Sequence, residues 1–176
     1  MKKFSLFLGT ILLAVLLLFG NSRNANAQFS GVLNALSGQA NSEPAGTTQG
    51  KSAGVALRNL YTQYKADGKI DTKNLSNILN MLQLVNSCSE LKNNKSDKTY
   101  MKDFTQGLLL GSSNLVTTNN STSVINSLTN LASTVDTSSL TAAATAIQTG
   151  TSQTTETVNS VATAANSVTN LVKLFK

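Results

Sequence analysis

The sequence has no histidine and no tryptophan, and only one of its 176 residues is a cysteine. Without histidine the chain has no imidazole for acid–base catalysis, for activating a serine or cysteine nucleophile, or for binding a metal ion. A single cysteine excludes a disulfide within the chain and a cysteine-based zinc site. We therefore expect a protein with no enzymatic activity and no cofactor.

Charged side chains are also few, at 12% of the residues. The formal net charge is +6, but residues 28–176 hold only 11 basic and 8 acidic side chains, for a net of +3. Proteins that bind nucleic acid gather Lys and Arg on one surface, whereas the lysines of this chain are scattered. We expect no nucleic-acid partner.

The first 27 residues are organised like a secretory signal peptide. Lys2 and Lys3 precede a run from Phe4 to Gly20 that is almost entirely apolar, and a short polar stretch then ends in Ala-Asn-Ala. This small-x-small pattern predicts cleavage after Ala27. The short Lys-Lys start and the Ala-Asn-Ala-Gln junction favour a bacterial source. The alternative is an uncleaved anchor, although the run is slightly short for a spanning helix. We expect a secreted or periplasmic protein that makes no membrane contact after cleavage.

The rest of the chain divides into three zones by composition. Residues 28–50 contain the only proline and are typical of a flexible linker, apart from a possible short helix over Phe29–Leu36. Residues 51–118 carry most of the charge. Residues 119–176 form a low-charge C-terminal region, and between 111 and 172 as many as 34 of 62 residues are Ser, Thr or Asn. Such a composition fits disorder, but the spacing of the apolar residues favours helices.

In the middle zone the apolar residues recur at helical spacing and predict a unit of three helices. Asp67-Gly68 is a signal for the end of the first helix, and Asp71 or Thr72 can cap the second. Because the connections are short, we expect an antiparallel unit that buries its own apolar faces. The apolar residues are Leu57, Leu60, Tyr61 and Tyr64, then Leu75, Ile78, Leu79, Leu82 and Val85, then Tyr100, Met101, Phe104, Leu108 and Leu115.

The C-terminal region continues the helical pattern through Leu128 and through a segment from Leu140 to Thr149 that Asp136 can cap. Its last helix carries the clearest apolar stripe: Val158, Val161, Ala165, Val168, Val172 and Phe175. This C-terminal stripe lies among Thr and Ser, which are mediocre helix formers, so the helix needs a packing partner. The partner is either the middle unit or a second copy of the chain, which would make a homo-oligomer. The predicted fold is all-α: a small helical bundle with a long Ser/Thr/Ala-rich C-terminal helical region.

Two short segments come close to known ligand-binding motifs. The glycines Gly46 and Gly50, followed by Lys51-Ser52, come close to a phosphate-binding loop, but they are one residue too close together and no strand precedes them. We interpret this segment as a flexible loop that leads into a helix capped near Ser52. The segment Asp67-Gly68-Lys69-Ile70-Asp71 resembles the centre of an EF-hand loop. The resemblance makes Asp67 and Asp71 weak candidates for calcium ligands, although Lys65 would occupy another ligand position.

The lone Cys88 lies near an apolar face, where burial is the usual outcome and a disulfide to a second copy is the alternative. Gly107 and Gly111 either let another helix approach closely or loosen the end of their own helix. Taken together, the sequence predicts an exported, non-enzymatic helical protein with a structural or protein-interaction role. The alternatives are an EF-hand-like module that binds calcium weakly and a carrier of an apolar ligand held inside the bundle.

Overall fold

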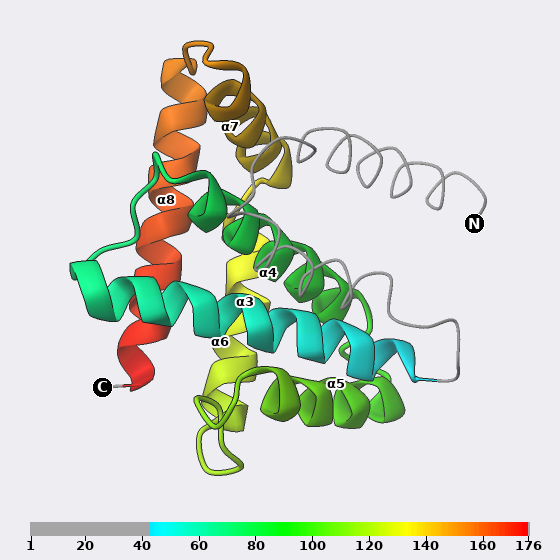
Figure 1. Cartoon of the computed structure of the whole chain (residues 1–176). Coiled ribbons are helices and arrows are strands. Elements are labelled where there is room, and N and C mark those ends of the chain that lie inside the picture. The colour runs from blue at the N-terminus through cyan, green and yellow to red at the C-terminus, as the bar shows by residue number, and fades with distance from the viewer. Residues whose placement is uncertain (1–42, 176) are drawn as a thin grey trace.

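The computed structural model describes residues 43–175, and in this range it contains six α-helices and no strand (Figure 1). The predicted all-α fold class is confirmed as a small helical bundle. The predicted signal peptide and residues 28–42 of the predicted linker lie outside the described residues. The elements are α3 (Ala45–Asp67), α4 (Leu75–Asn93), α5 (Lys98–Gly111), α6 (Ser121–Thr134), α7 (Thr137–Thr149), α8 (Thr155–Val172) and the 3-10 turn η1 (Lys173–Phe175).

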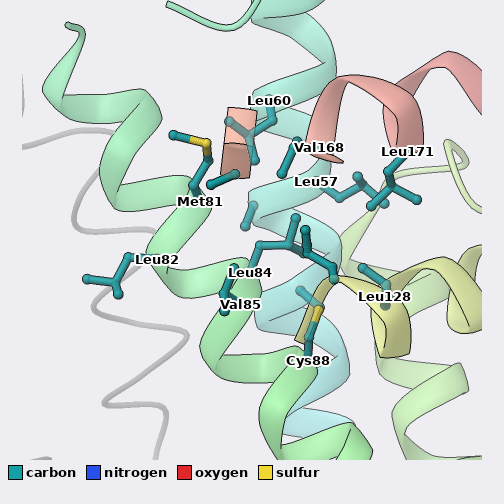
Figure 2. Packing of buried hydrophobic residues seen from close by; sticks show 14 of the residues in the cluster. Leu57, Leu60, Met81, Leu82, Leu84, Val85, Cys88, Leu128, Val168 and Leu171 are labelled. Atoms are coloured by element: carbon teal, nitrogen blue, oxygen red, sulfur yellow. The ribbon is translucent and has the colours of Figure 1, made fainter. Parts of the chain in front are cut away.

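Helix α4 is the centre of the bundle, because it contacts α3, α6, α7 and α8. It carries apolar side chains around most of its circumference, which is typical of a helix with neighbours on several sides. Figure 2 shows Met81 near Leu60 of α3, and Cys88 on the side of Leu128 of α6. The fully buried residues of α4 are Ile78, Met81, Leu84, Cys88 and Leu91.

Helices α3 and α4 pack antiparallel through a row of buried and partly buried hydrogen bonds. Successive hydrogen bonds join later residues of α3 to earlier residues of α4. Ser87 Oγ donates to Gln49 Oε1 at 3.2 Å, and Gln83 Nε2 donates to the carbonyl oxygen of Ser52 at 3.2 Å. Asn59 Nδ2 donates to Asn80 Oδ1 at 3.0 Å. We call the six residues Gln49, Ser52, Asn59, Asn80, Gln83 and Ser87 the polar seam.

Helices α3 and α5 pack parallel and much more closely, because glycines line their contact. A β-carbon on Gly50 would lie 2.1 Å from the carbonyl oxygen of Phe104, and one on Gly107 would lie 2.1 Å from the carbonyl oxygen of Thr47. Real β-carbons essentially never come this close to a backbone atom, so only glycine fits at either position. Gly107 and Gly111 therefore allow the approach of another helix, and that helix is α3.

This contact also explains why the predicted linker is wrong over its last residues. Residues 45–50 are helical, and α3 begins just after Pro44, where a proline suits the start of a helix. Glycine at positions 46 and 50 disfavours a helix by about 1 kcal/mol each in isolation. Packing on α5 reverses that preference, and Ser52 lies buried inside α3 and does not cap it.

The turn between α3 and α4 begins as predicted. Gly68 adopts the left-handed conformation, with a φ of 69°, and its N–H donates to the carbonyl oxygen of Tyr64 at 2.9 Å. The predicted cap of α4 at Asp71 or Thr72 is wrong, because Asn74 accepts the N–H groups of Ser76 and Asn77. The Asp71 carboxylate instead accepts the N–H of Lys73 at 2.9 Å, inside the turn.

The C-terminal region contains three helices. Asp136 caps α7 as predicted, although α7 begins at Thr137, three residues before Leu140. Gly150 ends α7 in the left-handed conformation, with a φ of 68°, and the N–H of Thr151 donates to the carbonyl oxygen of Ala146. The chain therefore turns back, and α8 packs against α7 (Figure 1).

Candidate interaction surface

The C-terminal stripe lies mostly inside the bundle. Val161, Val168 and Val172 are at most 1% exposed and Ala165 is 6% exposed, because α8 packs on α3, α4, α6 and α7. Of the two partners that the sequence left open, the chain itself covers these positions. Phe175 is half-buried, and Val158 is the exposed member of the stripe, with 49% of its surface exposed. A homo-oligomer through the stripe stays a prediction, and Val158 is the member that a second copy could reach.

The C-terminal end of the stripe is held against α3 by an aromatic contact. The rings of Tyr61 and Phe175 meet edge to face, with their centres 5.9 Å apart. Tyr61 Oη also donates a hydrogen bond to the carbonyl oxygen of Phe175 at 3.2 Å. The two contacts hold the last turn of the described chain against the C-terminal part of α3.

The turn that resembles an EF-hand loop holds two acidic residues with different roles. Asp67 is exposed at the last position of α3, whereas Asp71 is half-buried and bonded to the N–H of Lys73. Within residues 43–175 there is no group of three or more Cys, Asp or Glu side chains arranged to hold a metal ion. Calcium binding by Asp67 and Asp71 stays a prediction.

The buried Cys88 and the half-buried Tyr100 have raised pKa values. Cys88 is completely buried, as the sequence favoured, and its burial raises the pKa of the thiol far above the usual range. A thiol held protonated in this way is a poor nucleophile and a poor partner for a disulfide. Burial, with a smaller contribution from the charge of Glu90, raises the pKa of Tyr100 to about 12.

Charge divides the described surface into two parts. The helices α3, α4 and α5 and their connections carry most of the lysines and acids. Between residues 121 and 172, the only charged residues are Asp136 and Glu156. We call the exposed residues of α6, α7 and α8 the uncharged surface. Its members are Thr122, Ser123, Asn126, Asn130, Ser133, Thr134, Ser138, Ala142, Thr145, Thr149, Thr155, Val158, Asn159, Ala162, Thr163, Asn166 and Asn170, with the acid Glu156 at the start of α8.

Many hydroxyl groups of these helices bond to their own backbone. Along α7, the hydroxyls of Thr141, Thr145 and Thr149 each donate to the carbonyl oxygen four residues earlier, at 2.9–3.0 Å. Thr134 on α6 and Thr163 on α8 do the same. Such bonds fix the side-chain rotamer in advance, and Ser, Thr and Ala have little rotamer freedom to lose. Burying this surface against a partner therefore costs less entropy than burying lysines or glutamates.

Large apolar side chains are exposed at three separate places: Leu110 on α5, Val158 on α8 and Leu174 in η1. They come from different elements, and single exposed apolar residues are common on protein surfaces. No helix among residues 43–175 is long and apolar enough to span a bilayer.

Two features were missed at the level of sequence. The spacing Gly46, Gly50, Gly54 on α3 matches Gly107 and Gly111 on α5, and this repeated interval of four could have suggested a close helix pair. The polar seam had no such signal, because its amides and hydroxyls are ordinary surface residues when read one helix at a time. Comparison with protein-family models, with curated proteins and with solved structures gives no match.

Proposed function

We propose that the chain is an exported, non-enzymatic helical protein that acts by binding another protein, and that the uncharged surface makes the contact. The single observation that carries this proposal is the combination found on α6, α7 and α8: almost no charge, and hydroxyls already bonded to their own helices. The centres of protein interfaces are depleted in Lys, Glu and Asp, as well as in Ser and Ala, so it is the lack of charge on this surface, and not its Ser and Ala content, that supports a contact here. Export rests on the predicted signal peptide.

The charged half of the bundle is a less suitable contact surface. Lys65, Lys92 and Lys102 are exposed there, and long charged side chains lose about 2 kcal/mol of rotamer entropy each when a partner immobilises them. The ammonium groups of these lysines are strongly hydrated, so a partner that covered them would also have to displace their water. The division of the surface thus favours one side for contact.

Site-specific photocrosslinking tests the proposal. A photoreactive amino acid is placed at Thr145 or Asn166, both exposed on the uncharged surface, in cells that produce the protein. Matched controls carry it at the exposed positions Lys65 and Gln106 on α3 and α5. We expect crosslinked protein adducts from the first pair and few from the second. Adducts that form equally from both pairs, or only from the controls, would contradict the proposal.

The homo-oligomer is one form that such a contact could take. Light scattering during size exclusion of Gln28–Lys176, over a range of concentrations, measures the mass directly. If Val158 lies in a self-contact, Val158→Asp should shift the mass toward the monomer, while Leu110→Asp, at an exposed residue on α5, should not. A monomer at every concentration would exclude a second copy as the partner and leave other proteins.

A further inference from the structure

One flank of the central helix carries a second row of apolar residues. Leu75, Leu79 and Leu82 are spaced by four and three residues, so they share one side of α4. Leu75 and Leu79 are only partly buried, and Asn86 continues the same side as an exposed residue. We call Leu75, Leu79 and Leu82 the outer flank of α4.

The outer flank does not belong to the contact with α3. Figure 2 shows Leu82 pointing away from α3 and from the other labelled core residues. Leu82 is nevertheless buried. Leu75 and Leu79 keep part of their apolar surface exposed, and a cover on this side of α4 would stabilise the fold by about 25 cal/mol for each Å² of that surface.

The sequence just before α3 has the pattern of a suitable cover. Phe29, Val32, Leu33 and Leu36 follow one another at the spacing of a single helical face. A helix over residues 29–36 would be about 12 Å long, which equals the length of α4 from Leu75 to Leu82. The two apolar rows thus match in length and in chemistry.

The connection between these rows is also long enough. The bond between Gln49 and Ser87 puts the start of α3, one turn earlier, beside the last turns of α4 near Leu91. From Leu91 back to Leu82 is about 14 Å along α4. The six residues 37–42 can span about 20 Å when extended. The upstream chain therefore begins within reach of the outer flank.

We propose that residues 29–36 bind to the outer flank of α4 as an amphipathic helix of the same molecule. The tether gives this segment an effective concentration in the millimolar range, which a separate partner would rarely match. The segment immediately following the predicted signal peptide is then part of the folded bundle, and the N-terminus released at Gln28 lies on α4.

Cysteine labelling of Gln28–Lys176 tests the proposal. Leu79→Cys is introduced, and its reaction rate with a maleimide is measured with and without Phe29→Asp and Leu33→Asp. We expect the two aspartates to speed the labelling at least tenfold, because a charged segment leaves the flank. Cys88 adds no signal, since it is completely buried.

Leu110→Cys is the matched control, because it is exposed on α5, far from the outer flank in sequence. Its labelling rate should be the same with and without the aspartates, and an unchanged helical circular dichroism signal shows that the bundle stays folded. An unchanged rate at Leu79→Cys would overturn the proposal. Protection of Leu79→Cys that grows with protein concentration would also overturn it, because the cover would then come from a second copy.

Discussion

The hydroxyl of Tyr61 in α3 donates to the carbonyl oxygen of Phe175, 114 positions later in the chain, and their rings meet at an interplanar angle of 83°. This contact joins an early helix to the end of the described chain. It holds the last turn after α8 in place, where a helix of Ser, Thr and Ala would otherwise fray. Its loss should therefore lower the free energy of unfolding of the whole bundle.

We expect Phe175→Ala to lower the free energy of unfolding by about 2 kcal/mol, because the ring loses both its burial and its edge-to-face contact. Tyr61→Phe should cost only about 1 kcal/mol, since it removes one hydrogen bond and keeps the ring. Urea denaturation measures both. Leu174→Ala is the control, because Leu174 is 49% exposed and should change the stability by less than 0.5 kcal/mol.

The contact between α3 and α5 predicts an inverted glycine effect. In an ordinary exposed helix, glycine to alanine stabilises by about 1 kcal/mol. We expect Gly50→Ala and Gly107→Ala instead to destabilise by about 3 kcal/mol or more, because each new methyl group would overlap a backbone carbonyl of the other helix. Thermal melting gives the sign. Gly68→Ala meets no atom within 4 Å and should cost only about 1 kcal/mol for its left-handed backbone.

The polar seam contains one buried acceptor without a donor, the Oε1 atom of Gln83. Gln83→Leu should change the stability by less than about 1 kcal/mol, because it removes the hydrogen bond from Nε2 to the carbonyl of Ser52 together with a buried polar atom that has no partner. Asn80→Leu should lower it by about 2 kcal/mol, since it leaves Asn59 and the carbonyl of Ser76 without their partner. A loss of stability in Gln83→Leu as large as that in Asn80→Leu would show that both polar atoms of the Gln83 amide are hydrogen-bonded.

The cap of α7 predicts a pH dependence with a definite sign. Hydrogen bonds from Ser138, first from its side chain, and then from Ser139 lower the pKa of Asp136. A carboxyl group with a lowered folded-state pKa stabilises the fold above its unfolded pKa, near 3.9, and that stabilisation is lost as the pH falls through the folded value. Asp136→Ala should cost about 1 kcal/mol at pH 7 and much less at pH 2. Denaturation at both values, with Asp136→Asn as the control that keeps a cap, measures it.

The turn after α3 gives a prediction about calcium. We expect millimolar calcium to leave the melting temperature unchanged, because Asp67 and Asp71 offer two carboxylates and Asp71 already accepts the N–H of Lys73. Calcium binds six to eight oxygen ligands. A rise in the melting temperature that disappears in Asp67→Ala with Asp71→Ala would contradict this expectation and establish the EF-hand-like alternative.

The local features of the fold followed from short stretches of sequence. The end of α3 at Gly68, the cap at Asp136 and the apolar face of α8 each depend on residues within a few turns of one another. Periodicity also predicted that the face of α8 would be covered. It could not predict which helices cover this face, because the residues that pack on it come from four separate helices, α3, α4, α6 and α7.

The start of α3 could not be predicted from the sequence for the same reason. Read locally, Gly46 and Gly50 after a proline indicate a loop. They favour a helix only when α5 lies against them with its own glycines, about sixty positions later. Likewise, the burial of Ser52 and Ser87 follows only from the packing of α3 against α4.

The parallel pairing of α3 and α5 has a consequence for the order of folding. Two parallel helices that are neighbours in space cannot be joined by a short turn, so the chain has to run back along α4 before α5 can reach the glycines of α3. The closure of that long loop has to precede the tight contact, and contacts of large sequence separation form slowly. We therefore expect α3 and α4 to associate first as a hairpin, and α5 to close onto it in a later step that only glycine at these positions permits.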